Sequence, residues 1–524
     1  MSMDKSAQGE SHRGLIKSVS IVSLGTLSSR ILGFLRDVIL ARFLGTGFKA
    51  DAFFVAQKIP NLFRDLVGEG ATNSAFVPVF SEYVHTRSKK ELLEFISVIF
   101  ILGLMVLSAI TVLGIWLAPW VVKLIAPGFV VEPEKLELTV RLTRIIFPYL
   151  ILIGLTAYGM AVLYTFKSFV VPAFSPCLLN IALIISAVIS FYTMEEPEYG
   201  LAIGVLVGGV LQLLAHFRPI MKMGIRFVKP ASLNHKGALQ VGRLLLPRIL
   251  GSGVYQLAVF IDTFCASLSF VVGAGGISAI YYANRVIQFP MGIFTFAMAS
   301  AVLPTLSELA TKNDLPRFRK TLIFALENIF FVMFPTSILT MILARPIVRV
   351  LFERGEFNPY STEVTAMALM AYCIGLFSFG AIKIMVTAFH SLQDTKTPVK
   401  VAALCLCINT ALNFILMYPF LVGGIALASS IAGTVDFMIL FFVMDKRLGD
   451  MRQEMARYVS KIFIATFLTG LVVFYTWEKW AYPSEFIKLM AVGCLGLLAY
   501  GIATYVLKVQ QAQKICLWAT GRMK

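Results

Sequence analysis

Charged residues are scarce in this chain. They make up 14% of its 524 residues, whereas hydrophobic residues make up 58%. An average soluble domain is about 25% charged and about 45–50% apolar. Because a soluble fold of this length could not bury so much apolar surface, a soluble enzyme or binding domain is excluded. The composition predicts an all-α polytopic membrane protein whose main solvent is lipid.

Motifs built on cysteine and histidine are also lacking. The seven cysteines form no CxxC pair and no Cys/His cluster, and the five histidines show no metal-ligand spacing. Neither a disulfide framework nor a zinc site is therefore indicated. No HExxH, Walker loop or DxxD-type cluster appears, which argues against a membrane-embedded enzyme. The first 17 residues are polar, and no cleavable signal peptide is expected.

Long hydrophobic segments recur along the whole chain. A spanning helix needs about 20 mostly apolar residues, and fourteen segments meet this requirement. They lie near residues 16–43, 50–83, 92–122, 138–166, 172–192, 199–220, 238–270, 273–308, 318–350, 362–391, 398–419, 423–445, 455–477 and 484–508. The sequence therefore predicts 14 transmembrane helices.

Basic and acidic residues alternate in the short loops between these segments. Loops after even-numbered segments carry Lys and Arg, such as Lys312 and Arg317, whereas loops after odd-numbered segments carry acids, such as Glu195 and Glu196. By the positive-inside rule, both termini are expected in the cytoplasm, as in a multi-pass protein of the cytoplasmic (inner) membrane. The net charge of +17 is then a topology signal, and no nucleic-acid partner is expected.

The sequence contains an internal repeat. SAFVPVFSE at residues 74–82 matches SAVLPTLSE at residues 300–308 in five of nine positions, 226 residues apart. The two copies are six segments apart, which predicts two pseudo-symmetric six-helix lobes with a substrate site between them near the midplane. The predicted parts are an N-lobe at 1–225, a C-lobe at 226–447 and a C-terminal helix pair at 448–524. Shared membrane-helix composition is the alternative explanation of the match.

Charged and polar residues occur inside three predicted spans, where each charge costs about 2.5–3.5 kcal/mol at the bilayer centre. They are Ser29, Arg30, Arg36 and Asp37 in the first span, Lys58, Asn61, Arg64, Asp65 and Glu69 in the second, and Asn284, Arg285 and Gln288 in the eighth. Charges at this depth mark cavities and transport pathways by default, and arginine suits phosphate groups because its planar fork binds two oxygens at once. The alternatives are structural ion pairs and helix ends at the membrane surface.

A second polar group lies in the predicted C-lobe. Asp262, Asn409, Asn413 and Ser429 come from three spans, and their oxygen atoms would suit a monovalent cation. Hydrogen bonding between helices is an equally good explanation at this stage. No other metal or cofactor is expected.

Three motifs resemble the MurJ (MviN) family of lipid II flippases, within the multidrug/oligosaccharidyl-lipid/polysaccharide exporter (MOP) superfamily. These are SRILGFLRD, ADAFFVAQKIPNLFRDLVGEGA and YYANRVIQFPMGIF. The resemblance covers essentially the whole chain. It implies two lobes that open alternately to each side of the membrane. The implied substrate is lipid II, undecaprenyl-diphosphate-linked disaccharide-pentapeptide, and the implied partners are membrane lipids and cell-wall synthesis proteins.

The resemblance also implies functional positions. Substrate-binding residues would be Ser29, Arg30, Arg36, Asp37, Asn61, Arg64, Glu69 and Arg285, and a sodium site would comprise Asp262, Asn409, Asn413, Ile425 (through its carbonyl) and Ser429. The last two spans would form a groove for the lipid tail. This chain departs from some relatives, which carry acids where Asn284 and Gln288 stand, so the resemblance does not imply a neighbouring carboxylate for paired-charge switching at Arg285.

Two other functions fit a polytopic protein. A cation-coupled drug exporter of the same superfamily usually carries cationic substrates, so the arginines argue against it. A scaffold for cell-wall assembly should tolerate mutation of its intramembrane charges, whereas a flippase should not. The sequence leaves the energy source open between membrane potential and coupling to sodium or protons.

Overall fold

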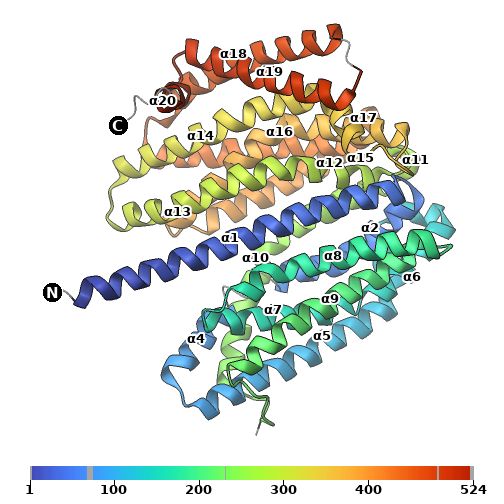
Figure 1. Cartoon of the computed structure of the whole chain (residues 1–524), viewed down its shortest axis with the longest axis vertical. Coiled ribbons are helices and arrows are strands. Elements are labelled where there is room, and N and C mark those ends of the chain that lie inside the picture. The colour runs from blue at the N-terminus through green and yellow to red at the C-terminus, as the bar shows by residue number, and fades with distance from the viewer. Residues whose placement is uncertain (1–2, 68–74, 231, 481–482, 520–524) are drawn as a thin grey trace. The chain divides into compact units, whose positions relative to one another are not determined.

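The computed structural model describes residues 3–67, 75–230, 232–480 and 483–519, and the described residues are helical without β-strands (Figure 1). The chain forms two compact units, residues 1–256 and 257–524.

The long helices of the first unit are α1 (Met3–Leu44), α2 (Phe48–Val67), α5 (Lys89–Ile125), α6 (Pro133–Ile146), α7 (Tyr149–Thr165), α8 (Val170–Thr193) and α9 (Pro197–Lys222). Those of the second unit are α12 (Gly276–Pro290), α13 (Phe296–Thr311), α14 (Leu315–Ile342), α16 (Pro359–Ser391), α17 (Lys396–Leu448), α18 (Met451–Lys479) and α19 (Glu485–Val506). Helix α10 (Lys236–Ala266) crosses the boundary, and the short helices are α4 (Val77–Thr86), α11 (Ser269–Val272), α15 (Ala344–Phe352) and α20 (Gln510–Ala519), with the 3₁₀-helix η2 (Pro127–Val131) and the π-helix η3 (Met291–Thr295).

Ten helical stretches of the described chain are long and apolar enough to cross a membrane. This confirms the prediction of an all-helical, polytopic membrane protein. Helices α1, α2 and α10 are not among the ten, and each contains basic residues that lower its mean hydropathy. The count of 14 spans and the division into lobes at 1–225, 226–447 and 448–524 stay predictions.

Within the first unit, α8 packs against both α1 and α9, while α2 packs against α6 and α7. The copy of the repeat in this unit continues into α4, whose Phe80 ring lies 5.0 Å from the Phe95 ring of α5. Tyr158 of α7 joins this aromatic group and donates a hydrogen bond to the carbonyl oxygen of Ile96 at 2.9 Å. Buried aromatic packing thus fixes the helices that follow the charged residues of α2.

Within the second unit, α16 packs against α12, α14 and α17, and α18 packs against α14 and α19 (Figure 1). Hydrogen bonds hold the last two long helices on α14, because Tyr458 and Tyr500 donate to the carbonyl oxygens of Glu327 and Phe331, each at 2.9 Å. The opposite side of α18 exposes Phe463 and Phe467. Exposed aromatic and aliphatic side chains on a long helix are expected where the helix faces lipid.

Helix α17 consists of two arms joined at Leu421, where φ is 51° and ψ is −133°. Pro419 ends the first arm because it cannot donate a backbone hydrogen bond within a helix. The arms correspond to the predicted spans at 398–419 and 423–445. At Gly424 the second arm passes so close to the Leu416 carbonyl group that a Cβ atom would overlap it.

Replacing Gly424 by alanine is therefore expected to destabilise the second unit by about 1–3 kcal/mol, the usual cost of forcing extra atoms into a packed site. Gly493→Ala on α19 is the matched control, because no atom lies within 4 Å of its added Cβ. Thermal unfolding of the purified variants in detergent would measure both effects. Equal unfolding midpoints for the two variants would contradict the close contact at the junction of the arms.

Candidate functional site

Arg36 of α1, one of the predicted substrate-binding residues, is held by two side chains. Its Nε and Nη2 atoms donate to Oδ1 of Asp37 at 2.9 and 2.7 Å, and its Nη1 donates to Oδ1 of Asn180 at 3.0 Å. The side chain of Asp37 is fully buried, whereas that of Arg36 keeps 11% of its surface exposed. The guanidinium is thus oriented from two sides while part of it stays accessible to a ligand.

Asn180 of α8 connects this arginine to a second predicted residue. Its Nδ2 atom donates to the backbone carbonyl of Ser29 at 3.1 Å. Helices α1 and α8 can approach this closely because Gly25 lies against the backbone of Ala173, where a Cβ atom would come within 2.6 Å of the carbonyl oxygen. Asn180 was not among the predicted site residues, and the sequence signal was a single asparagine within the apolar run of the fifth span.

The other predicted residues of the first unit are less fully described. Arg30 lies on α1 with an exposed side chain, and Asn61 is half-buried on α2. Arg64 belongs to α2, but its side chain is outside the described residues, as is the whole of Glu69. Among the predicted residues of the first unit, Ser29, Arg36 and Asp37 lie close together, because Asn180 contacts Ser29 and Arg36, and Arg36 contacts Asp37.

Arg285 of α12 has neutral partners in the second unit. Its Nη2 donates to the Tyr281 hydroxyl at 3.0 Å and its Nη1 donates to Oε1 of Gln288 at 3.2 Å. Its guanidinium also lies over the Tyr281 ring, 5.4 Å from the centroid. Gln288 in turn donates to Oδ1 of Asn284 at 3.2 Å. Asn284 and Gln288 thus form an amide chain that orients Arg285 without adding negative charge.

Asp262 of α10 is the centre of the predicted cation site. Its Oδ1 accepts hydrogen bonds from Nδ2 of Asn409 at 3.0 Å and of Asn413 at 2.7 Å. Its Oδ2 accepts a hydrogen bond from the Ser429 hydroxyl at 3.3 Å. The two asparagines lie on the first arm of α17 and the serine on the second, so three helical segments converge on one carboxylate.

The donor set of this cluster fits a monovalent cation. The Oδ1 atoms of Asn409 and Asn413 are buried, and neither has a hydrogen-bond partner among the described residues. Because amide oxygen and nitrogen atoms exchange places by a flip of the side chain, these oxygens can turn toward Asp262. A cation would then find carboxylate, amide and hydroxyl oxygens, the hard ligands that sodium prefers. Ile425 is buried on the second arm, and the role of its carbonyl stays a prediction.

A buried ion pair at the opposite end of α2 from Arg64 was not predicted. Lys135 Nζ of α6 lies 3.1 Å from Asp51 Oδ2 of α2, and each side chain is 2% exposed. The ammonium group also lies 4.5 Å from the Phe129 ring centroid. Nearby, buried Glu198 of α9 pairs with Lys49 at 3.3 Å. These contacts hold the ends of α2, α6 and α9 together.

Lys135→Met is expected to destabilise the protein by about 3–5 kcal/mol, because it leaves the Asp51 carboxylate buried without its cation. Arg141→Met on the same helix is the control. Arg141 pairs with Glu137 on the surface, with side chains 58% and 64% exposed, and exposed pairs contribute about 0–1 kcal/mol. Thermal unfolding of both variants would decide. A double variant, Asp51→Leu with Lys135→Met, should regain most of the stability that Lys135→Met loses. If the double variant is as unstable as Lys135→Met alone, the ion-pair explanation is contradicted.

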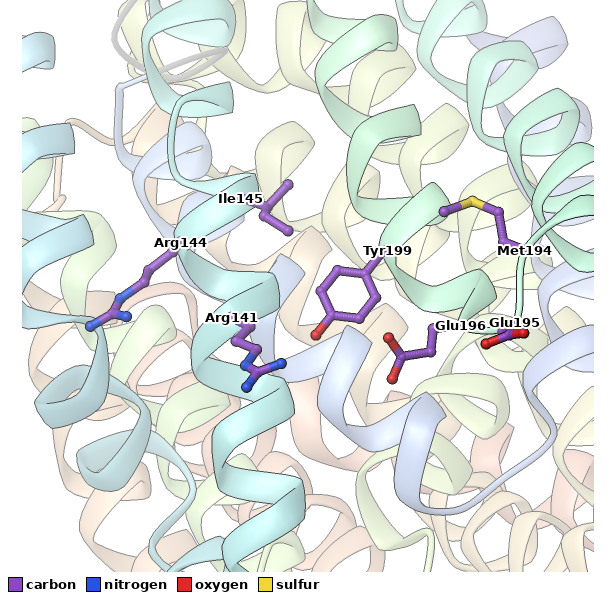
Figure 2. Close-up of a pocket in the computed structure, with 7 residues that line it drawn as sticks. All are labelled: Arg141, Arg144, Ile145, Met194, Glu195, Glu196 and Tyr199. Atoms are coloured by element: carbon purple, nitrogen blue, oxygen red, sulfur yellow. The ribbon is translucent and has the colours of Figure 1, made fainter.

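A charged pocket of about 730 Å³ lies among α6, α9 and the α8–α9 connection (Figure 2). It is lined by Arg141, Arg144, Ile145, Met194, Glu195, Glu196 and Tyr199. In Figure 2, Arg141 points toward Tyr199 and Glu196, whereas Arg144 points away from them. Its two arginines and two glutamates balance, and it contains none of the predicted substrate-binding residues. A diphosphate needs excess positive charge, so this pocket is not the candidate substrate site.

Comparison with known proteins places the chain among transporters. The family model described as lipid II flippase MurJ matches residues 40–492. The chain is 33% identical over 512 residues to the probable lipid II flippase MurJ of Vibrio cholerae serotype O1, covering 94% of this chain and 95% of the relative. It is 34% identical over 500 residues to the lipid II flippase MurJ of Burkholderia cenocepacia, covering 93% and 95%.

Solved structures agree with this comparison. The fold is similar to that of a lipid II flippase MurJ in an inward closed conformation, with a TM-score of 0.78, 28% identity, and coverage of 93% of this chain and 98% of the other. It is also similar to an inward-facing multidrug resistance MATE family transporter of the MOP superfamily, with a TM-score of 0.68, 17% identity, and coverage of 84% and 99%. The second likeness extends to the fold alone.

Proposed function

The chain belongs to the lipid II flippase MurJ family, and on that premise we propose that it moves lipid II from the inner to the outer leaflet of the cytoplasmic membrane. It is a transporter and not an enzyme. The observation that carries the proposal is the family match over residues 40–492, which spans most of the chain and includes the predicted substrate-binding positions Asn61, Arg64 and Arg285. The proposal also explains why α1 and α12 carry arginines within predicted membrane spans, since these arginines would bind the diphosphate.

In this proposal the diphosphate of lipid II is bound by arginines. Arg36 is the leading residue, since Asp37 holds its Nε and Nη2 in place while Nη1 contacts the neutral amide of Asn180. A phosphate oxygen can take the place of the asparagine oxygen, which exchanges a neutral acceptor for a charged one, and arginine can bind phosphate through two parallel hydrogen bonds. Arg30, Arg64 and Arg285 would add positive charge for the second phosphate and the headgroup.

Transport would proceed by alternating access of the two units, with 14 spans and both termini in the cytoplasm. One of the ten apolar stretches, α17, would count as two spans because it has two arms, and α1, α2 and α10 would add three more, which gives 14. The undecaprenyl tail would stay in lipid along the exposed apolar side of α18 and α19. Cation binding at Asp262 and the membrane potential, worth about 2.3 kcal/mol per charge per 100 mV, are the two candidate energy sources.

The experiment that tests the function is replacement of a host's own flippase. Cells depleted of that protein are supplied with this chain, and lipid II exposed on the outer leaflet is measured by an externally added enzyme that acts only on accessible headgroups. We expect growth and outward lipid II to be restored. Normal membrane insertion without either effect would contradict the proposal, and export of cationic dyes instead would favour the drug-exporter alternative.

A further inference from the structure

Asp436 is a carboxylate of α17, on the same side of that helix as Ser429 of the Asp262 cluster. It lies on the second arm, seven residues after Ser429, and a separation of seven residues is close to two full helical turns. The axial distance between the two positions is about 10 Å at 1.5 Å per residue. From Ser429 to Asp436, the second arm runs toward the end of α17 that the charge pattern predicts to lie in the cytoplasm. Asp436 is not among the site residues predicted from the sequence.

The side chain of Asp436 is partly buried. Its Oδ1 atom is buried and has no hydrogen-bond partner among the described residues. The titratable group that faces it is the thiol of Cys405 on the first arm, a side chain that is 5% exposed. Helices α11, α12, α14, α16 and α18 also pack against α17, and among their described residues no charged group interacts electrostatically with Asp436.

A bare carboxylate inside the membrane is costly unless it is paired, bound to a metal ion or neutralised. The surroundings of Asp436 argue against the first two solutions. No cation from the described part of the chain reaches it, and a thiol sulfur is a soft ligand that suits neither sodium nor magnesium. A single carboxylate also falls short of the several oxygen ligands that a hard cation requires. A proton needs one oxygen atom and removes the charge.

We propose that Asp436 is a proton-binding site in the second unit, separate from the cation site at Asp262. Proton binding converts the carboxylate to a neutral acid whose O–H group can donate a hydrogen bond. The same two arms of α17 hold both sites, since Cys405 lies one turn from Asn409 and Asp436 lies two turns from Ser429. Occupancy of one site can therefore influence the other through the relative position of the arms. Proton binding by the free protein requires no substrate, so it stands apart from the proposed flippase function.

Infrared difference spectroscopy tests the proposal directly. The full-length protein in vesicles of phosphatidylethanolamine and phosphatidylglycerol is taken from alkaline to acidic pH, and the carbonyl band of a protonated carboxylic acid in a dehydrated environment is followed. We expect this band in the unmodified chain and in Asp262→Asn, and we expect Asp436→Asn to lack it. Asp436→Glu should retain the band at a shifted frequency, which also covers the case in which Asp436→Asn fails to fold.

A second measurement tests coupling in the same vesicles. A proton gradient is imposed while valinomycin and potassium hold the membrane potential at zero, and the accessibility of a cysteine placed on the outer end of α16 is followed by thiol labelling. The labelling rate should respond to the gradient in the unmodified chain and not in Asp436→Asn. An infrared band that survives unchanged in both Asp436→Asn and Asp436→Glu would overturn the proposal, whatever the result of any lipid II assay.

Discussion

In cells depleted of their own flippase, Arg36→Ala is expected to fail to support growth even when its expression is raised until its membrane level matches that of the unmodified chain. The substitution removes a guanidinium that is held both by a buried carboxylate and by the amide of Asn180. Hydrogen bonds to charged groups contribute about 1.5–3 kcal/mol each. Loss of two such bonds to the diphosphate corresponds to at least about 100-fold in the rate of flipping. The rate is measured as outward accessibility of lipid II in vesicles containing the purified variant.

Two further variants separate the role of Arg36 from a general need for positive charge on α1. Arg42→Ala is the matched control, because Arg42 lies on the same helix with an exposed side chain that contacts the neighbouring Phe43 ring. It should retain normal flipping. Arg36→Lys keeps the charge but loses the planar fork, so an intermediate rate is expected. Growth of Arg36→Ala cells at the level of Arg42→Ala cells would show that Arg36 has a structural role.

The architecture could be predicted from the sequence to the extent that it depends on local composition. A hydrophobic run is read directly from the chain, so the predicted spans at 172–192 and 199–220 match α8 and α9. Interruptions were harder to predict. The predicted span at 138–166 is two helices separated at Phe147 and Pro148, because a proline within an apolar run can either bend a helix or end it, and packing decides which.

The candidate site could be predicted only where its partners are close in sequence or share one evident chemistry. Arg36 and Asp37 are adjacent, and the oxygen-bearing residues around Asp262 were grouped because they are rare within apolar spans. Asn180 was missed, since its partner Arg36 lies 144 residues away and a lone asparagine is typical of hydrogen bonding between helices. Lys135 was missed for a similar reason. It follows several acids in a loop, and burial beside Asp51 depends on tertiary packing that composition does not reveal.

The Asp262 cluster leaves two explanations that differ in what the asparagines do. If the cluster only joins helices, the amide nitrogens face the carboxylate permanently and sodium has no effect on the protein. If the cluster binds sodium, the amides flip and the buried Oδ1 atoms of Asn409 and Asn413 become ligands. Binding to the folded state stabilises a protein by about 2.7 kcal/mol when the ligand concentration is 100 times Kd. The two explanations therefore predict different responses of thermal stability to sodium.

Asp262→Asn is expected to abolish a sodium-dependent rise in the unfolding midpoint, while the fold persists because the asparagine oxygen still accepts hydrogen bonds. Removing the single negative charge should weaken sodium binding by at least about 100-fold, or about 2.7 kcal/mol. Asp450→Asn is the matched control, since Asp450 is exposed at the start of α18; it should respond to sodium like the unmodified chain. Unfolding is measured in sodium chloride and in choline chloride at equal ionic strength. If the unmodified chain unfolds at the same temperature in both salts, Asp262 joins helices and sodium is not the coupling ion, which leaves the membrane potential or protons to drive transport.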